Sequence, residues 1–391
     1  MRRVISIQGG GVAILAALAL AHLTGCGNSS AEGYEPTAIY PPRTDPLITS
    51  LATVPPPKGL HPPGMLNESI ASLTAQGAKM VNPSNLSADQ QQTISKVLVP
   101  LFGTPADPIV ADAGAAALGL TPERLAAGSI VYKRHCVQCH GMSGDGRGPT
   151  SLWVYPPARD FREAGFKFVS TPSGQGWPTK DDIVRSVRRG IGGNSMPSFA
   201  LLSDKDLDDV ATYTLHLMFR GKVEFDLINR MLSQEDLTDV AGFARQRLTV
   251  NFNEWQRAVA DAKDPAILPP TDPAPGANIE AIRRGHATFI SEKAACTTCH
   301  VDYGRRSVWR YDLWGVAVKP AALTEGQHRG GSEALDLYRR LKCGVPGVGM
   351  PPAPTQYTDN DLWDVVAFLR ALPDPKFLPD DVRKEVYPNV R

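Results

Sequence analysis

The chain has 391 residues, of which 42% are hydrophobic and 21% charged, so it is long enough for two or three soluble domains with cores of their own. The formal net charge is +1, and without Arg2 and Arg3 the balance becomes 39 basic residues against 40 acidic ones. A chain this close to neutral lacks the basic excess of nucleic-acid-binding proteins, so no nucleic-acid partner is expected.

The first 25 residues have the layout of a bacterial export signal. Arg2 and Arg3 precede an apolar run from Val12 to Leu20 that is too short to span a membrane. The segment closes on Leu-Thr-Gly before Cys26, which resembles the lipobox of bacterial lipoproteins. The resemblance implies cleavage before Cys26 and a lipid on its sulfur, which would hold the protein to a membrane on the periplasmic side of the cell envelope. A plain secretory signal with an incidental cysteine is the alternative.

Two segments follow the signal. Residues 26–66 contain YPPRTDP and VPPPKGLHPPG, and proline at this density stiffens a chain without letting it pack, which predicts a tether. Residues 67–118 are predicted to form an N-terminal helical extension. The stretch from Leu86 to Phe102 begins with Ser87 as a helix N-cap and spaces its apolar residues as a helix does.

The pattern Cys-x-x-Cys-His occurs twice in a chain that has only six cysteines. It is the attachment motif of c-type haem, in which the two thiols form thioethers with the porphyrin and the histidine coordinates the iron. The motif residues are Cys136, Cys139 and His140 in the first copy and Cys296, Cys299 and His300 in the second. A structural zinc site needs its paired ligands within one domain, whereas these copies stand about 160 residues apart. A redox-active dithiol would not explain the histidine in both copies, so we expect two covalently bound haem c groups.

An internal repeat indicates the second iron ligand of each haem. Residues 182–197 read DIVRSVRRGIGGNSMP and residues 336–351 read DLYRRLKCGVPGVGMP, and both end on a Met-Pro pair after a glycine-rich loop. The methionines, Met196 and Met350, follow their haem histidines by 56 and 50 residues. A methionine is more often core filling than a ligand, but its matching position in both copies favours ligation. His328, on a loop of the second copy, is the alternative to Met350.

The flanks of the two copies also match. A glycine and an aromatic residue lie one helical turn apart before each motif, as Gly128 with Tyr132 and as Gly285 with Phe289. A predicted helix with aromatic residues follows each methionine. Each copy therefore begins and ends with a predicted helix.

This arrangement resembles class I cytochrome c over residues 121–218 and 278–372. The resemblance implies an all-α fold of two small helical domains in tandem, each wrapped round one haem with histidine and methionine ligands. The expected domains span residues 119–220 and 278–375, joined by a helical connector at 221–277 and followed by a C-terminal tail at 376–391.

Two further residues of the first domain are candidate partners of the haem. In CHGMSGDGRGP, the resemblance implies that Pro149 offers its carbonyl oxygen to the second ring nitrogen of His140. Arg159, in YPPARDF, is a candidate partner of a haem propionate, because a guanidinium pairs with a carboxylate through two hydrogen bonds. A solvated surface arginine is the alternative. The second domain has no proline that matches Pro149, so this expectation does not extend to His300.

Electron transfer is the function expected from this ligation. A histidine and a thioether fill both axial positions of the iron and raise its reduction potential. We expect a respiratory-chain carrier of single electrons rather than an enzyme, either free-standing or a subunit of an oxidoreductase complex. Its donor would be a membrane dehydrogenase or a quinol-oxidising complex, and its acceptor a terminal oxidase or a soluble cytochrome. The alternatives, a dihaem peroxidase and a haem-based gas sensor, need one iron with an open position, which the duplicated Met-Pro loops oppose.

Overall fold

The computed structural model describes residues 33–50, 79–172, 176–233, 237–265, 278–307, 309–312 and 316–389. The expected signal peptide, Cys26 and part of the expected connector lie outside the described residues. Across the described ranges, no helix combines the length and the apolar character that a membrane span requires.

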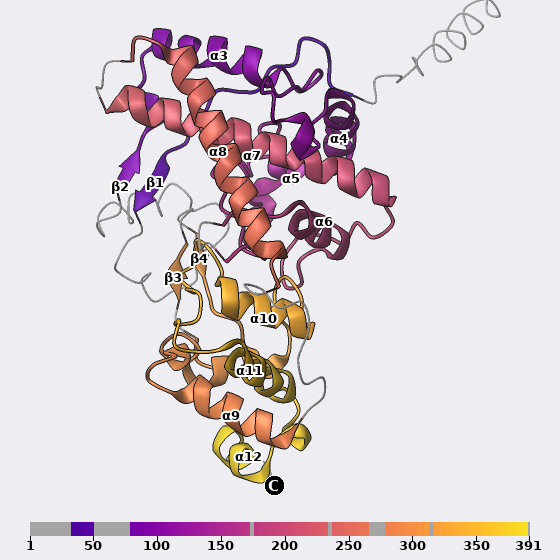
Figure 1. The fold of residues 1–391 in the computed structure, drawn as a ribbon, viewed down its shortest axis with the longest axis vertical. Helices are drawn as coiled ribbons and strands as arrows, with labels where there is room; N and C mark the ends of the chain where they lie inside the picture. The colour runs from indigo at the N-terminus through magenta and orange to yellow at the C-terminus, as the bar shows by residue number, and fades with distance from the viewer. Residues whose placement is uncertain are drawn as a thin grey trace, which may run out of the picture.

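The described part of the chain is mostly helical (Figure 1). The helices of the first half are α3 (Ala88–Phe102), α4 (Pro122–His135), α5 (Val137–His140), α6 (Lys180–Arg189), α7 (Asp204–Leu232) and α8 (Val240–Lys263). Those of the second half are α9 (Ile279–Ile290), α10 (Ala334–Cys343), α11 (Asp359–Ala371) and α12 (Asp380–Val386). Strands within the described residues form two short antiparallel ribbons, β1 (Leu47–Ser50) with β2 (Lys79–Val81) and β3 (Arg310–Tyr311) with β4 (Ala317–Val318). The predicted all-α class is confirmed.

Serine and threonine side chains begin several of these helices. Ser87 of α3, Thr179 of α6 and Thr358 of α11 each accept a hydrogen bond from the N–H three residues later, and the side chain at that position accepts one from the cap N–H. These reciprocal bonds satisfy N–H groups that the first helical turn leaves unpaired. The start of α3 at Ser87 is as predicted.

Each half is built on two helices that cross at a glycine. α4 meets α7 at Gly128, where an added Cβ would collide with the carbonyl oxygen of Asp209. α9 meets α11 at Gly285, where an added Cβ would collide with the carbonyl oxygen of Asp364. The two predicted glycine positions are therefore the points at which the helix backbones touch.

The predicted aromatic residues are buried beside these crossings. The ring of Tyr132 lies 5.3 Å from that of Tyr213, and the ring of Phe289 lies 5.5 Å from that of Phe368, measured between centroids. Buried hydrophobic residues of the two halves form two separate clusters. In Figure 1 the helices of the second cluster, drawn orange to yellow, lie below those of the first.

α7 is one continuous helix that passes the domain boundary predicted at residue 220. α8 folds back along it, so that Phe252 and Trp255 contact Phe219 with ring centroids 4.6 and 5.9 Å apart. These residues belong to the hydrophobic cluster of the first half. The apolar face of α7 continues beyond residue 220 and is covered by α8.

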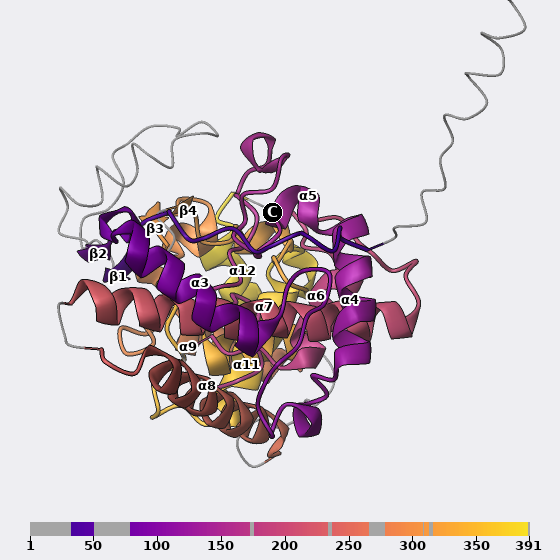
Figure 2. The ribbon, with the colours of Figure 1, turned by 90° about the horizontal axis from the view of Figure 1, so that it is seen from above.

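Residues 33–47 of the predicted proline-rich tether pack on the first half. Tyr40 is buried, and its hydroxyl lies 3.0 Å from that of Tyr213. The side chain of Arg43 is fully buried and donates to Glu163 at 2.5 Å. Seen from above, the indigo segment before β1 crosses the first half from α4 to β1 (Figure 2). The prolines keep the chain extended, and the side chains between them are the ones that pack.

Candidate functional site

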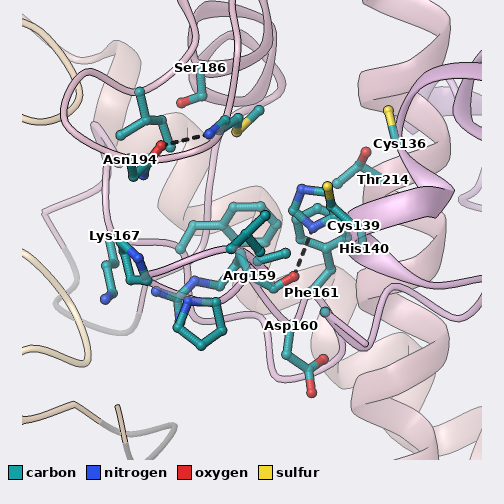
Figure 3. A pocket seen from close by; sticks show the side chains of 18 of the residues that line it. Cys136, Cys139, His140, Arg159, Asp160, Phe161, Lys167, Ser186, Asn194 and Thr214 are labelled. Atoms are coloured by element: carbon teal, nitrogen blue, oxygen red, sulfur yellow. Dashed lines mark hydrogen bonds between the residues drawn. The ribbon is translucent and has the colours of Figure 1, made fainter. Parts of the chain in front are cut away.

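The first Cys-x-x-Cys-His segment lines a cavity of about 300 Å³. α5 carries Cys139 and His140 on one wall, with Cys136 just before it, and Met196 lines the cavity from the loop between α6 and α7. Figure 3 shows Cys139 and His140 on one side and Asn194, two residues before Met196, on the other. All four residues predicted to hold the first haem therefore line one cavity.

The ring of His140 is fixed in one orientation. Its Nδ1 lies 3.0 Å from the carbonyl oxygen of Arg159, and the ring stacks on Phe161 with centroids 4.4 Å apart. Burial lowers the pKa of His140 to about 4, so the imidazole is neutral at pH 7. Because Nδ1 faces an acceptor, it carries the proton, which leaves Nε2 as a metal ligand.

Pro149 does not supply the acceptor that the family resemblance implied. Its neighbours bond to the motif backbone instead: the N–H of Gly148 donates to Cys139 O at 3.1 Å, and the N–H of Thr150 donates to Gln138 O at 2.9 Å. This pairing holds the loop along the backbone of the cysteine segment. The role expected of the Pro149 carbonyl is filled by that of Arg159, ten residues further on.

Cys136 and Cys139 are unpaired thiols. Burial raises the pKa of the Cys136 thiol to about 12, whereas thiols of redox-active dithiol sites have lowered pKa values. In the described part of the chain, no three His, Cys, Asp or Glu side chains gather as they would round a zinc ion. The raised pKa of the Cys136 thiol disfavours a redox-active dithiol at this motif.

A glycine opens each methionine loop. Gly190 has φ +67° and Gly344 has φ +71°, and a Cβ on either would press on the backbone of the Met-Pro segment. The loops then close with matching hydrogen bonds, from the N–H of Ile191 to Met196 O at 3.1 Å and from the N–H of Val345 to Met350 O at 2.9 Å. The repeat seen in the sequence is thus a repeat in geometry, and it places each methionine at a cavity wall.

The second motif lines a separate cavity of about 500 Å³. Cys296, Cys299, His300 and Met350 all contribute to its walls. The Nδ1 of His300 lies 3.2 Å from the carbonyl oxygen of Ala321, and burial lowers the pKa of the ring. The two cavities therefore contain the same types of side chain, and in each a backbone carbonyl oxygen lies beside the Nδ1 of the histidine.

The carbonyl acceptors were missed in the sequence. They are Arg159 and Ala321, which follow their histidines by 19 and 21 residues. Arg159 comes just after the Pro-Ala of YPPAR, and Ala321 is the alanine of the Pro-Ala in KPAA. A shared Pro-Ala pair at a similar distance from both motifs was the available signal.

The side chain of Arg159 also lines the first cavity. Burial lowers the pKa of its guanidinium, and the carboxylates of Asp312, Asp160 and Glu163 act in the opposite direction. A partly buried cation at the cavity wall suits a carboxylate-bearing ligand. The pairing of Arg159 with a haem propionate stays a prediction.

The residues of both cavities fit haem c. Each cavity offers two thiols for thioether bonds, a neutral histidine with Nε2 left for iron, and a methionine thioether. The structure brings together the predicted ligands in each case, and it does not place Pro149 among them.

Comparison with known proteins gives one family match. Residues 123–213 match the family described as cytochrome c oxidase, cbb3-type, subunit III. These residues form a domain of the cytochrome c type. The match runs from α4 into α7 and includes Cys136, Cys139, His140 and Met196, and cytochromes c bind their haem covalently. We refer to this first half as the cytochrome c domain and to the half from residue 278 as the second module.

A chain of the reducing HAO-like protein complex of Kuenenia stuttgartiensis is similar in structure. It is 24% identical over 63% of this chain and 95% of that chain, with a TM-score of 0.46. No curated protein matches this chain in sequence.

Proposed function

We propose that the chain is a dihaem cytochrome c that carries single electrons between components of a respiratory chain. The observation that carries the proposal is the duplicated site: in each cavity a backbone carbonyl holds the histidine and a methionine thioether lines the wall. A haem bound by these ligands supplies reversible one-electron iron chemistry at a raised potential.

The protein's own residues position the ligands of both sites. The carbonyls of Arg159 and Ala321 orient the histidines, and the loops opened by Gly190 and Gly344 hold the methionines. A site with both axial positions filled changes little between oxidation states, which suits electron transfer better than binding of peroxide or gas.

The setting of this activity is also a proposal. The lipobox-like sequence before Cys26 supports export and a lipid anchor, which would place the protein at a membrane on the periplasmic side of the cell envelope. There it would accept electrons from a membrane dehydrogenase or quinol-oxidising complex and pass them to a terminal oxidase or soluble cytochrome.

The test is the visible spectrum of the reduced holoprotein before and after carbon monoxide, with the haem content counted beforehand. Two haems per chain and an unmoved Soret band are expected, because Met196 and Met350 would occupy the positions that carbon monoxide needs. A prompt shift of about half the haem would contradict the proposal and favour a peroxidase or a gas sensor. The variants Met196→Ala and Met350→Ala would then identify the open site.

A further inference from the structure

The two cavities share a wall. Lys167, Phe168 and Arg329 line both of them. Lys167 and Phe168 belong to the cytochrome c domain and Arg329 to the second module, so each half contributes to the other's cavity. In Figure 1, α10 and the β3–β4 ribbon are the parts of the second module that lie nearest the first half.

Side-chain contacts across the junction fix this wall. The guanidinium of Arg340, which lines the second cavity, lies 4.9 Å from the ring centroid of Phe168. Gly330, at φ +79°, lies so close to Phe168 that a Cβ would collide with the ring. The ammonium of Lys167 pairs with Asp312 of the second module at 2.8 Å. The wall exists only when the two halves are docked.

Three cationic side chains lie at the wall. Lys167, Arg329 and Arg340 are cationic, and Asp312 is the carboxylate paired with Lys167. Burial lowers the pKa of Arg340 to about 10, so it keeps its charge at pH 7. Carboxylates such as Asp160 and Glu163 also line the first cavity. Among the described residues that line the second cavity none is Asp or Glu, so the cations there suit an anionic ligand.

Two polar atoms at the second cavity are buried without a hydrogen-bond partner among the described residues. They are Nε of Arg340 and Nε2 of His328, and both residues line this cavity. A buried polar group left unpaired is unfavourable, so such atoms point to a ligand that completes them. The carboxylates that haem carries are its propionates.

We propose that Lys167, Arg329 and Arg340 form one carboxylate-binding wall that takes propionate groups from both haems and links the reduction potentials of the two irons. This inference rests on the proposed dihaem function. His328 completes the wall on the side of the second cavity as a propionate partner.

The link between the potentials follows from Coulomb's law. A positive charge near an iron favours the ferrous state, and a residue that lines both cavities acts on both irons. Loss of such a charge changes each reduction equilibrium by about threefold to tenfold. For a one-electron couple, this corresponds to about 30 to 60 mV, at 59 mV per tenfold change.

The experiment is a spectroelectrochemical titration of the holoprotein and three variants. Arg329 is exposed, so Arg329→Gln keeps the fold, and it is expected to lower both potentials. Arg340→Gln is expected to lower the second potential and leave the first in place, because Arg340 lines only the second cavity. Arg306→Gln is the matched control: its side chain is 75% exposed, lines neither cavity, and should move neither potential.

The number of haems per chain distinguishes failure of the proposed dihaem function from failure of the shared wall. A wild-type chain with one haem would overturn the proposed function and this inference with it. Two haems per chain with Arg329→Gln shifting one potential or none would overturn the shared wall alone. The same holds if Arg306→Gln shifts the potentials as much as Arg329→Gln does, since the effect would then be one of net charge.

Discussion

At the scale of the single residue, burial keeps a histidine uncharged in the core of the cytochrome c domain. His216 of α7 is fully buried, and its Nε2 lies 3.1 Å from the Tyr40 hydroxyl. Burial, followed by the charge of Arg220, lowers the pKa of His216 to about 3. The unfolded chain takes up this proton near pH 6.5 and the folded chain near pH 3, so between these values the unfolded state binds more protons.

The free energy of unfolding should therefore fall as the pH drops through this window, by roughly 1.4 kcal/mol per pH unit from His216 alone. His216→Phe removes this contribution, so the free energy of unfolding should depend less steeply on pH between pH 6 and pH 4. Urea unfolding at several pH values measures both slopes. Parallel slopes for the wild type and His216→Phe would contradict the assignment.

A second residue-scale prediction concerns the support of His140. Pro149 is exposed and its carbonyl is not the acceptor of Nδ1, so Pro149→Ala should leave the potential and spectrum of the first haem unchanged. Surface substitutions of this kind usually change stability by less than about 0.5 kcal/mol. A lowered potential in Pro149→Ala, measured by redox titration, would show that the Pro149 carbonyl acts on the histidine after all.

The cysteines, histidines and methionines of the site could be predicted because their chemistry depends on side chains at fixed spacing. The acceptors at Arg159 and Ala321 could not be, because every residue has a carbonyl oxygen and only the fold decides which one meets the ring. The Pro-Ala pair near both acceptors is a signal that becomes recognisable only once the fold shows which carbonyl oxygens meet the rings.

At the scale of the element, the helix crossings should tolerate no extra atom. Gly128→Ala would press its Cβ on the Asp209 carbonyl and Gly285→Ala on the Asp364 carbonyl. Overpacking of this kind costs about 1–3 kcal/mol. Thermal unfolding should show a lower midpoint for either variant.

Gly192→Ala is the matched control for both crossings. Nothing lies within 4 Å of a Cβ added there, so its midpoint should stay close to that of the wild type. Equal midpoints for Gly128→Ala and Gly192→Ala would mean that α4 and α7 do not touch at this glycine.

Elements with a regular pattern were predicted well, and elements whose partners lie far along the chain were not. The N-cap at Ser87 and the glycine-aromatic pairs of α4 and α9 are local signals, and the structure has them where expected. The packing of residues 33–47 depends on partners such as Tyr213 and Glu163, more than a hundred residues away. From composition alone, such a segment is predicted to be a spacer.

At the scale of the whole molecule, Gly330 controls how closely the halves approach. Its Cβ in Gly330→Ala would collide with Phe168 of the other half, whereas Gly326→Ala has a similar positive φ and would meet Pro373 of its own half. Both variants carry backbone strain, but only Gly330→Ala should loosen the junction. Small-angle X-ray scattering should show a larger radius of gyration for Gly330→Ala and not for Gly326→Ala. An unchanged radius for both would contradict the close contact at Phe168.

The packed N-terminal segment has a consequence for how the protein would meet its partners. The ammonium of Lys133, on α4, donates to the carbonyl oxygen of Gly33, so the chain is already bound to the cytochrome c domain seven residues after Cys26. Seven residues reach at most about 25 Å. With a lipid on Cys26, this end of α4 would stay within that distance of the bilayer, and the search for an electron donor would be two-dimensional, along the membrane surface.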